Sequence, residues 1–362
     1  MNFIPRALIA ELTHRCPLHC VYCSNPLEMQ AREHELATAD WVRVFEEARA
    51  LGVLQLHLTG GEPLARTDLV ELVAAGRAAG LYVNLITSGV GLNEERFHAL
   101  ADAGLDHFQL SFQDAREAEA NEFAGTRAHA LKLRVAEMVH TRRMAFTVNM
   151  VVHRRNLDRL EELIALAETL RAGRLEIANV QYYGWALKNR EALLPTRRQL
   201  DESLAIVEQA RERLQGRMRI EYVVPDYYAR FPKPCMGGWG HGLMLIDPAG
   251  AVLPCHAAGV IPGLEFSNVR GRALRWIWEE SPAFTRFRGE DWMPDPCRAC
   301  DRRERDFGGC RCQAFLLTGD AASTDPVCTL APAHGLVEAV VAAVNVNGDE
   351  NAGPWVYRID PV

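Results

Sequence analysis

Short apolar runs alternate with amphipathic stretches through the first 185 residues of the chain. Six of these runs, rich in Val, Ile, Leu and Phe, have the length and composition of β-strands. They span residues 7–12, 53–59, 82–88, 107–113, 145–153 and 174–182. In the stretches between them, apolar residues recur at the spacing of helices that bury one face. Gly52, Gly80 and Gly104 follow three of these stretches and mark helix ends.

This alternation predicts the fold class. Strand–helix–strand units with right-handed crossovers build a parallel sheet covered by helices. Eight such units close a barrel, whereas this chain supplies six. We therefore predict an α/β fold, a partial (β/α)6 barrel over residues 1–216, with its last helix near residues 196–214.

The chain changes character after residue 216. Residues 217–346 carry seven of the ten cysteines, several turn-forming Pro and Gly residues, and few long periodic runs. This composition predicts a second, cysteine-rich domain that a metal organises. Residues 347–362 are polar and rich in turn residues, so we expect a loosely attached C-terminal tail.

Composition and charge narrow the functional classes. The chain is 48% hydrophobic and 24% charged, as packed globular proteins are, and its formal net charge of −7 disfavours nucleic acid or an anionic membrane as partner. Glu11 and His14 precede any apolar core of a signal peptide, and the apolar run at 336–346 is shorter than the ~18 residues that a bilayer requires. We expect a cytoplasmic protein, in which disulfides are rare and the cysteines serve another purpose.

Three cysteines, Cys16, Cys20 and Cys23, follow the first predicted strand within a single short loop. Three thiolates at the carboxyl end of a barrel strand can converge on one iron–sulfur cluster. Because a [4Fe–4S] cluster has four irons, one iron would lack a protein ligand and could bind a small molecule. A structural zinc site completed by His14 or His19 is the alternative. Zinc ligands usually come as two separated pairs, so the spacing favours the cluster.

The next strand ends in Thr-Gly-Gly-Glu-Pro at residues 59–63. Gly60 and Gly61 would let the backbone approach a ligand closely, and the Glu62 carboxylate can hold an ammonium group. An ordinary tight turn explains the same letters. The position one strand–helix unit after the cysteines favours a binding role.

With these two motifs the chain resembles the radical S-adenosylmethionine superfamily. The resemblance implies that Cys16, Cys20 and Cys23 hold a [4Fe–4S] cluster whose open iron binds S-adenosylmethionine. One electron from the cluster then yields a 5′-deoxyadenosyl radical that abstracts hydrogen from a substrate. The resemblance also implies cofactor contacts from Tyr22, Gly60, Gly61, Glu62, Ser88, Ser111 and Asn149. Polar caps at strand ends explain the four residues outside the glycine motif equally well.

The seven remaining cysteines resemble the auxiliary-cluster domain known as SPASM, found in radical enzymes that modify peptides. The family's ligand run is CX2CX5CX3C, and the same register here reads Cys297, Cys300, Asp306 and Cys310. The third position is therefore Asp, which departs from the pattern. One open and two closed clusters need eleven protein ligands, whereas the chain has ten cysteines.

The simplest completion takes Asp306 as the eleventh ligand. One auxiliary cluster is then assigned to Cys235, Cys255, Cys310 and Cys312. The other is assigned to Cys297, Cys300, Asp306 and Cys328. Each is expected as [4Fe–4S] or [2Fe–2S]. An ion pair with Arg302, Arg303 or Arg305 is the alternative role for Asp306.

A finer resemblance lies in residues 180–190, 236–250 and 300–312, which are similar to a family of peptide cyclases in pyrroloquinoline quinone biosynthesis. The resemblance implies a carbon–carbon bond between a Glu γ-carbon and a Tyr ring in the precursor peptide PqqA. It also implies delivery of the peptide by the chaperone PqqD and a flavodoxin-type reductant.

Several questions stay open from the sequence. Asp114, Glu62 and Tyr183 are candidate bases for the substrate tyrosine because they fall near predicted strand ends, and none is singled out. Another peptide-modifying enzyme of the same class, such as a sulfatase maturase or a thioether-forming enzyme, is an alternative. A non-catalytic zinc or electron-transfer protein is an alternative of a different class.

Overall fold

One nine-stranded sheet forms the frame of the molecule. The computed structural model describes residues 3–346 and 354–360. The strands are β1 (Ala7–Glu11), β2 (Gln55–Thr59), β3 (Tyr82–Thr87), β4 (His107–Phe112), β5 (Ala145–Val152), β6 (Arg174–Asn179), β7 (Arg219–Val223), β8 (Leu243–Ile246) and β9 (Val252–Leu253). Their order is β7-β6-β5-β4-β3-β2-β1-β8-β9, and every pair is parallel except β8 with β9.

The six predicted strands are β1 to β6, and the prediction of a partial barrel is confirmed. The sheet nevertheless continues past residue 216, where we expect the barrel to end. β7 pairs with β6, and β8 pairs with β1 at the other side of the barrel strands. β7 alternates charged with apolar residues, and β8 is a run of only four buried residues. Neither segment has the length that a strand prediction from apolar runs requires.

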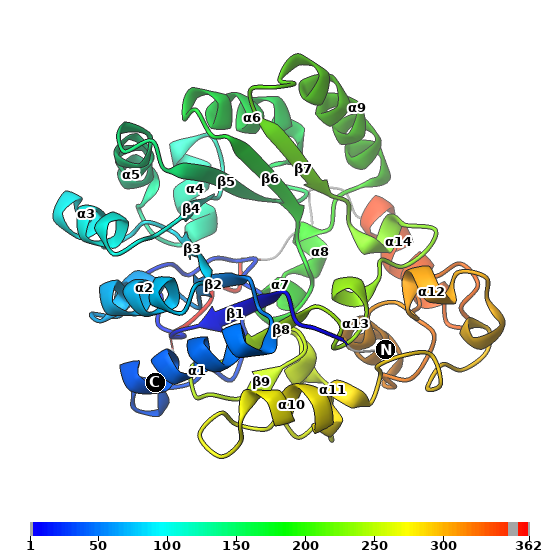
Figure 1. The fold of residues 1–362 in the computed structure, drawn as a ribbon. Coiled ribbons are helices and arrows are strands. Elements are labelled where there is room, and N and C mark those ends of the chain that lie inside the picture. Colours follow the sequence, from blue (N-terminus) through cyan, green and yellow to red (C-terminus); the bar gives the residue numbers. More distant parts are fainter. Residues whose placement is uncertain (1–2, 347–353, 361–362) are drawn as a thin grey trace.

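Helices cover the outside of the curved sheet (Figure 1). The helices of the first 216 residues are α1 (Thr38–Leu51), α2 (Leu69–Ala78), α3 (Glu94–Asp102), α4 (Glu117–Ala124), α5 (His129–Thr141), α6 (Leu160–Thr169), α7 (Gly184–Lys188), α8 (Arg190–Leu193) and α9 (Arg197–Arg213). α9 is the helix predicted near residues 196–214, and it begins at a capping box between Thr196 and Gln199. Fully buried residues such as Leu8, Leu58 and Phe108 pack the helices onto the sheet.

The cysteine-rich region has little regular structure. Its helices are α10 (Leu274–Glu280), α11 (Pro282–Thr285), α12 (Arg303–Asp306), α13 (Arg311–Thr318) and α14 (Gly335–Val346), and α12 to α14 gather at one side of the sheet (Figure 1). Its separate core cluster includes the side chains of Cys255 and Cys312. Turns therefore bring the cysteines together in this region.

The end of the chain is docked rather than loose. Residues 354–360 lie against the cysteine loop that follows β1, and the Arg358 side chain is 2% exposed. The expectation of a loosely attached tail is wrong for these residues, because contacts with a loop more than 300 residues upstream leave no local sequence pattern. Residues 347–353 and 361–362 lie outside the described part.

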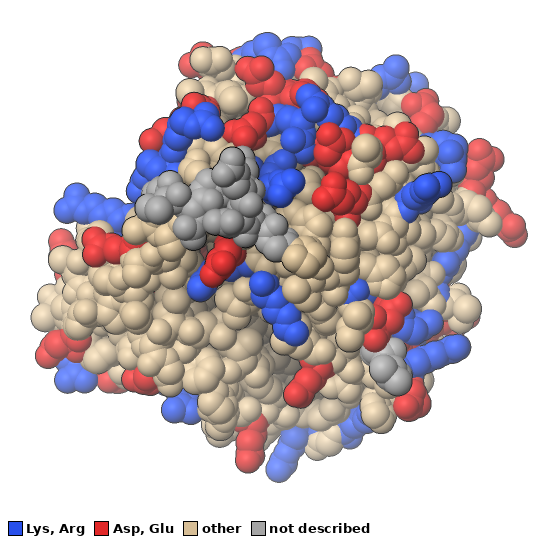
Figure 2. All heavy atoms as spheres, turned by 180° about the vertical axis from the view of Figure 1, so that it is seen from behind, with Lys and Arg blue, Asp and Glu red and all other residues tan. Residues whose placement is uncertain are grey.

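The surface agrees with the sequence-based exclusions. None of the helices within residues 3–346 is long and apolar enough to cross a membrane. On the face shown in Figure 2, basic and acidic residues are interspersed.

Candidate active site

A cavity of about 380 Å³ opens at the carboxyl ends of the parallel strands. Consecutive strand ends supply its polar wall, in the order Thr59, Ser88, Ser111, Asn149 and Asn179. Ser111 of β4 and Asn149 of β5 are direct neighbours in the sheet. Carboxyl ends of strands are where barrel enzymes bind their ligands, because the loops there are free to carry function.

The three cysteines of the first motif line the same cavity. Cys16, Cys20 and Cys23 lie on the loop after β1, and all three thiols are free. Burial raises the pKa of each thiol, that of Cys23 to about 12. A buried thiolate is costly without a cation, and bound iron would supply that cation. Three soft donors beside an open cavity therefore fit an iron–sulfur cluster.

The glycine motif serves the cysteine loop as well as the cavity. Gly60 and Gly61 line the cavity, and the Gly61 N–H donates to the Thr13 carbonyl at 2.6 Å. A Cβ atom on Gly61 would lie 2.5 Å from the His14 carbonyl oxygen, and Gly60 has a φ of +141°. Only glycine permits this approach, so the motif fixes the start of the cysteine loop.

Glu62 is buried and fully hydrogen-bonded. Its Oε1 accepts from Thr87 Oγ1 at 2.6 Å, and its Oε2 accepts from the Ser88 N–H at 2.7 Å and from the Ser88 hydroxyl. Burial raises the pKa of Glu62, whereas these hydrogen bonds act to lower it. The residues that line the cavity include Ser88 but not Glu62. Direct contact between Glu62 and the cofactor stays a prediction, and in this arrangement the carboxylate orients Ser88.

Tyr22, the residue expected beside an adenine ring, also lines the cavity. Its ring packs 5.7 Å from that of His153, and burial raises the pKa of its hydroxyl. Ser88, Ser111 and Asn149 lie in the cavity wall with it. The structure thus brings six of the seven expected cofactor residues to one cavity, and their contacts with the cofactor stay predictions.

Sequence reasoning missed a buried amine behind this wall. Lys132 of α5 is 1% exposed, and its Nζ donates to the Ser111 carbonyl at 2.9 Å and to Gln113 Oε1 at 2.5 Å. Burial lowers its pKa to about 8. The available signal was its rarity, since the chain has only three lysines. Gln113, which it orients, lines the cavity.

Two of the candidate bases occupy different surroundings. Asp114 is fully buried and paired with Arg159 at 2.5 Å, which gives it a structural partner. The Tyr183 hydroxyl lies 3.4 Å from Cys310 Sγ. Tyr183 therefore belongs to the neighbourhood of the auxiliary cysteines.

The first predicted auxiliary set comes together in the structure. Cys255 and Cys312 have their sulfur atoms 3.6 Å apart. Hydrogen bonds from the thiols of Cys235 and Cys312 hold the pKa of Cys255 and of Cys310 well below its ordinary value. These four thiols form one contacting group, and soft thiolate sets of this kind bind iron–sulfur clusters.

The second predicted set is looser. The charges of Cys297, Asp306 and Cys300 all act on Cys328 and raise its pKa, after burial. Asp306 also accepts from Arg302 at 2.8 and 2.9 Å, which is the ion pair considered as its alternative role. Within the described residues, no group of three or more His, Cys, Asp or Glu is arranged to hold a single metal ion. Ligation by Asp306 stays a prediction.

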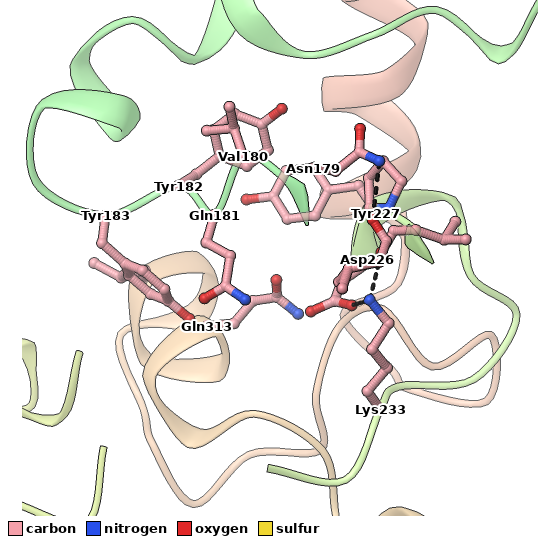
Figure 3. Close-up of a pocket in the computed structure, with 13 residues that line it drawn as sticks. Asn179, Val180, Gln181, Tyr182, Tyr183, Asp226, Tyr227, Lys233 and Gln313 are labelled. Atoms are coloured by element: carbon pink, nitrogen blue, oxygen red, sulfur yellow. Dashed lines mark hydrogen bonds and ion pairs between the residues drawn. The ribbon is translucent and has the colours of Figure 1, made fainter. Parts of the chain in front are cut away.

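A second cavity of about 30 Å³ lies near Tyr183 and α13 (Figure 3). Asp226 and Lys233 form an ion pair at 2.9 Å in its wall, and the buried Tyr182 hydroxyl has no partner among the described residues. Its volume is that of roughly one water molecule. Residues 179–181 line both cavities, so this polar pocket adjoins the larger one.

Comparison with known proteins agrees with this geometry. The chain matches the Radical SAM superfamily over residues 10–167 and an iron–sulfur cluster-binding domain, SPASM, over residues 235–301. It is 57% identical over 355 residues to the PqqA peptide cyclase of Methylobacterium nodulans, covering 98% of this chain and 93% of that protein. It is 58% identical over 357 residues to that of Bradyrhizobium diazoefficiens, again over 98% and 93%. The chain belongs to the PqqA peptide cyclase family.

Solved structures extend the likeness of this family member to its fold. Streptococcus suis SuiB bound to S-adenosylmethionine superposes with a TM-score of 0.76 at 19% identity, over 90% of this chain and 78% of that one. The enzyme anSMEcpe with bound AdoMet gives 0.63 at 16% identity, over 94% and 95%. The cyclase is thus a radical SAM enzyme with S-adenosylmethionine and iron–sulfur clusters as its cofactors.

Proposed function

We propose that this protein joins a Glu γ-carbon to a Tyr ring carbon within the precursor peptide PqqA, as the first step of pyrroloquinoline quinone biosynthesis. Its relatives at 53–58% identity are PqqA peptide cyclases. The observation that carries the proposal is the cavity at the strand ends, which has three free cysteines in its wall and adjoins the auxiliary cysteines through residues 179–181 and Tyr183.

Each cysteine group has a role in this proposal. Cys16, Cys20 and Cys23 would hold the cluster that cleaves S-adenosylmethionine, and the bound pair supplies the radical that removes hydrogen from the peptide. The remaining seven cysteines with Asp306 would hold two clusters that exchange single electrons. The same set of ligands leaves the first cluster one iron short of full protein ligation.

The side chains of the barrel bind and orient. Ser88, fixed by Glu62, and the neighbouring pair Ser111 and Asn149 present hydroxyl and amide groups to the cavity from rigid strand ends. Rigid elements hold reacting groups in place better than loops do. Burial of this wall also keeps water from a reactive centre.

Formation of the crosslink removes two hydrogens from the peptide. One leaves as an atom to the 5′-deoxyadenosyl group, and the other leaves as a proton and an electron. Tyr183 lies between the cavity and Cys310, so the side of the cavity that faces the auxiliary cysteines is where the electron would depart. We propose PqqD as the chaperone that presents the peptide, a flavodoxin-type protein as reductant, and the cytoplasm as the location.

Mass spectrometry of the peptide tests the function. The anaerobic enzyme is incubated with synthetic PqqA, PqqD, S-adenosylmethionine and a reductant. We expect a product lighter by two hydrogens, with a Glu–Tyr crosslink in its fragment ions. A thioether, an oxidised side chain, or 5′-deoxyadenosine without any change in the peptide would contradict the proposal.

Asp306 has its own test. We propose that it leaves Arg302 and ligates an iron when the second auxiliary cluster forms, because carboxylate oxygen is an acceptable though harder donor. Asp306→Ala should lower the iron content or change the EPR signal of one auxiliary cluster only. Glu304→Ala, on the exposed face of the same short helix, serves as the control. Unchanged iron and EPR in Asp306→Ala would refute ligation.

A further inference from the structure

Residues 354–360 are held against the first cysteine loop by reciprocal hydrogen bonds. The Arg358 N–H donates to the His19 carbonyl at 3.3 Å, and the His19 ring nitrogen Nδ1 donates to the Arg358 carbonyl at 2.8 Å. Nearer α8, the Asn189 side chain donates to the Val356 carbonyl at 2.8 Å and accepts from its N–H at 3.0 Å. These paired contacts fix the register of the segment on the loop.

The Arg358 side chain enters the loop itself. Nη1 donates to the Leu18 carbonyl at 3.3 Å, and Nη2 donates to the His14 carbonyl. These two carbonyls flank Cys16 on either side in the sequence. The guanidinium thus ties the two limbs of the loop that carries the cysteines, and Arg358 lines the same cavity as they do.

The charge of this guanidinium is incompletely matched. Its carboxylate partner, Asp360, accepts from Nη1 at 2.8 Å but is 50% exposed, so solvent screens that charge. The third contact is with the neutral sulfur of Met29 at 3.3 Å. Nε is buried and has no hydrogen-bond partner among the described residues. A buried cation with an unused donor is costly unless an anion completes it.

We propose that Arg358 is a positioning residue for the first cluster: the docked C-terminal segment clamps the cysteine loop, and the free Nε–H completes its bonding on the anionic cluster and its thiolates. This inference rests on the assignment of Cys16, Cys20 and Cys23 as ligands. Its charge acts on all three cysteines, where it partly offsets the rise in pKa caused by burial. Hydrogen bonds and positive charge near cluster sulfurs raise the reduction potential.

The test uses the full chain, purified anaerobically with all its clusters and without S-adenosylmethionine. Redox titration followed by EPR gives the potential of each cluster, and a chelator assay gives the rate of iron release. We expect Arg358→Gln to lower the potential of the first cluster and to release its iron about tenfold faster. The auxiliary clusters should keep their signals, which also reports that the variant is folded.

Two further variants separate charge from clamping. Arg358→Lys keeps the charge but loses the forked contact, so the potential should return toward wild type while iron release stays fast. Arg155→Gln is the control, since Arg155 is exposed and packs on Trp355 of the same segment at 5.7 Å. It should behave as wild type.

The opposing results are distinct. An Arg358→Gln protein with wild-type potential and iron release overturns the inference, as does an effect that appears only when S-adenosylmethionine is added, which would assign Arg358 to the cofactor carboxylate. An equal change in all clusters also overturns it, because the role would then be general folding. A wild-type protein without the first cluster would instead refute the cofactor assignment on which the inference rests.

Discussion

The barrel and the cysteine-rich region position their metal ligands by different means. In the barrel, three ligands lie within one short loop, and the hydrogen bonds of the sheet fix the strand ends around them. In the cysteine-rich region, the expected ligands are spread from Cys235 to Cys328 over turns and short helices. The barrel can form its site from backbone bonding alone, whereas the second region depends on what the cysteines bind.

The cores of the two regions show the same contrast. Strand residues such as Leu8 and Leu58 are fully buried among other apolar side chains. In the second region, Cys255 and Cys312 are 5% and 0% exposed and occupy core positions themselves. A cluster bound there replaces part of the apolar packing that such a small core cannot supply.

Removal of iron gives the largest expected difference between the two regions. After anaerobic chelation, backbone amides of residues 235–328 should lose their protection against hydrogen exchange, because the cysteine contacts alone cannot hold the turns. Peptides from β2 to β6 should keep theirs. Hydrogen-exchange mass spectrometry measures both, and equal loss in the two regions would contradict the contrast.

Single ligand replacements should separate the two chemistries. Cys20→Ala should reduce 5′-deoxyadenosine formation to background, because the first cluster is lost. Cys310→Ala should retain 5′-deoxyadenosine formation while the crosslinked peptide disappears. Chromatography of the nucleoside and mass spectrometry of the peptide, run on the same reaction, compare the two. Crosslinking by the Cys310 variant at the wild-type rate would show that this auxiliary site is dispensable.

The glycine motif sharpens the comparison within the barrel. Gly61→Ala places a methyl group 2.4 Å from the Arg15 carbonyl oxygen, and we expect a loss of about 1–3 kcal/mol with depletion of the first cluster. Gly242→Ala is the matched control, since nothing lies within 4 Å of its added Cβ atom. Iron analysis and chemical unfolding test both variants. Normal first-cluster content in Gly61→Ala would show that the loop tolerates displacement.

The smallest effect is the pH dependence of the barrel. Burial lowers the pKa of His153 to about 3 from 6.5, so the unfolded chain binds the extra proton below pH 6.5 and stability falls as the pH drops. Between pH 7.5 and 5.5 this residue should account for about 1.4 kcal/mol. His153→Gln should reduce the acid sensitivity of urea unfolding, whereas His98→Gln, at an exposed site, should not. Equal pH dependence in wild type and His153→Gln would disprove this role.

The sequence allowed more of the barrel than of its surroundings to be predicted. Apolar runs marked β1 to β6 because a strand buried on both faces reads as a continuous hydrophobic segment. β8 escaped because four residues among glycines carry no such signal. Motif spacing placed the cysteines, and strand ends placed Ser88 and Asn149, since parallel strands bring their carboxyl ends to one edge.

Other features depend on contacts that no local pattern records. Glu62 turned toward Ser88 instead of lining the cavity, and this follows from the approach of β3 to the glycine turn. Lys132 reaches the wall from α5, and Arg358 reaches the cysteine loop from the far end of the chain. Such residues become visible only when the tertiary structure brings separate segments together.

The central claim is that one iron of the first cluster lacks a protein ligand and binds S-adenosylmethionine. Electron–nuclear double resonance of the reduced enzyme with S-adenosylmethionine labelled by ¹⁵N at its amino group tests this directly. The account predicts a strong coupling between that nitrogen and the first cluster, and its loss in Cys20→Ala. An intact first cluster that shows no such coupling would contradict it.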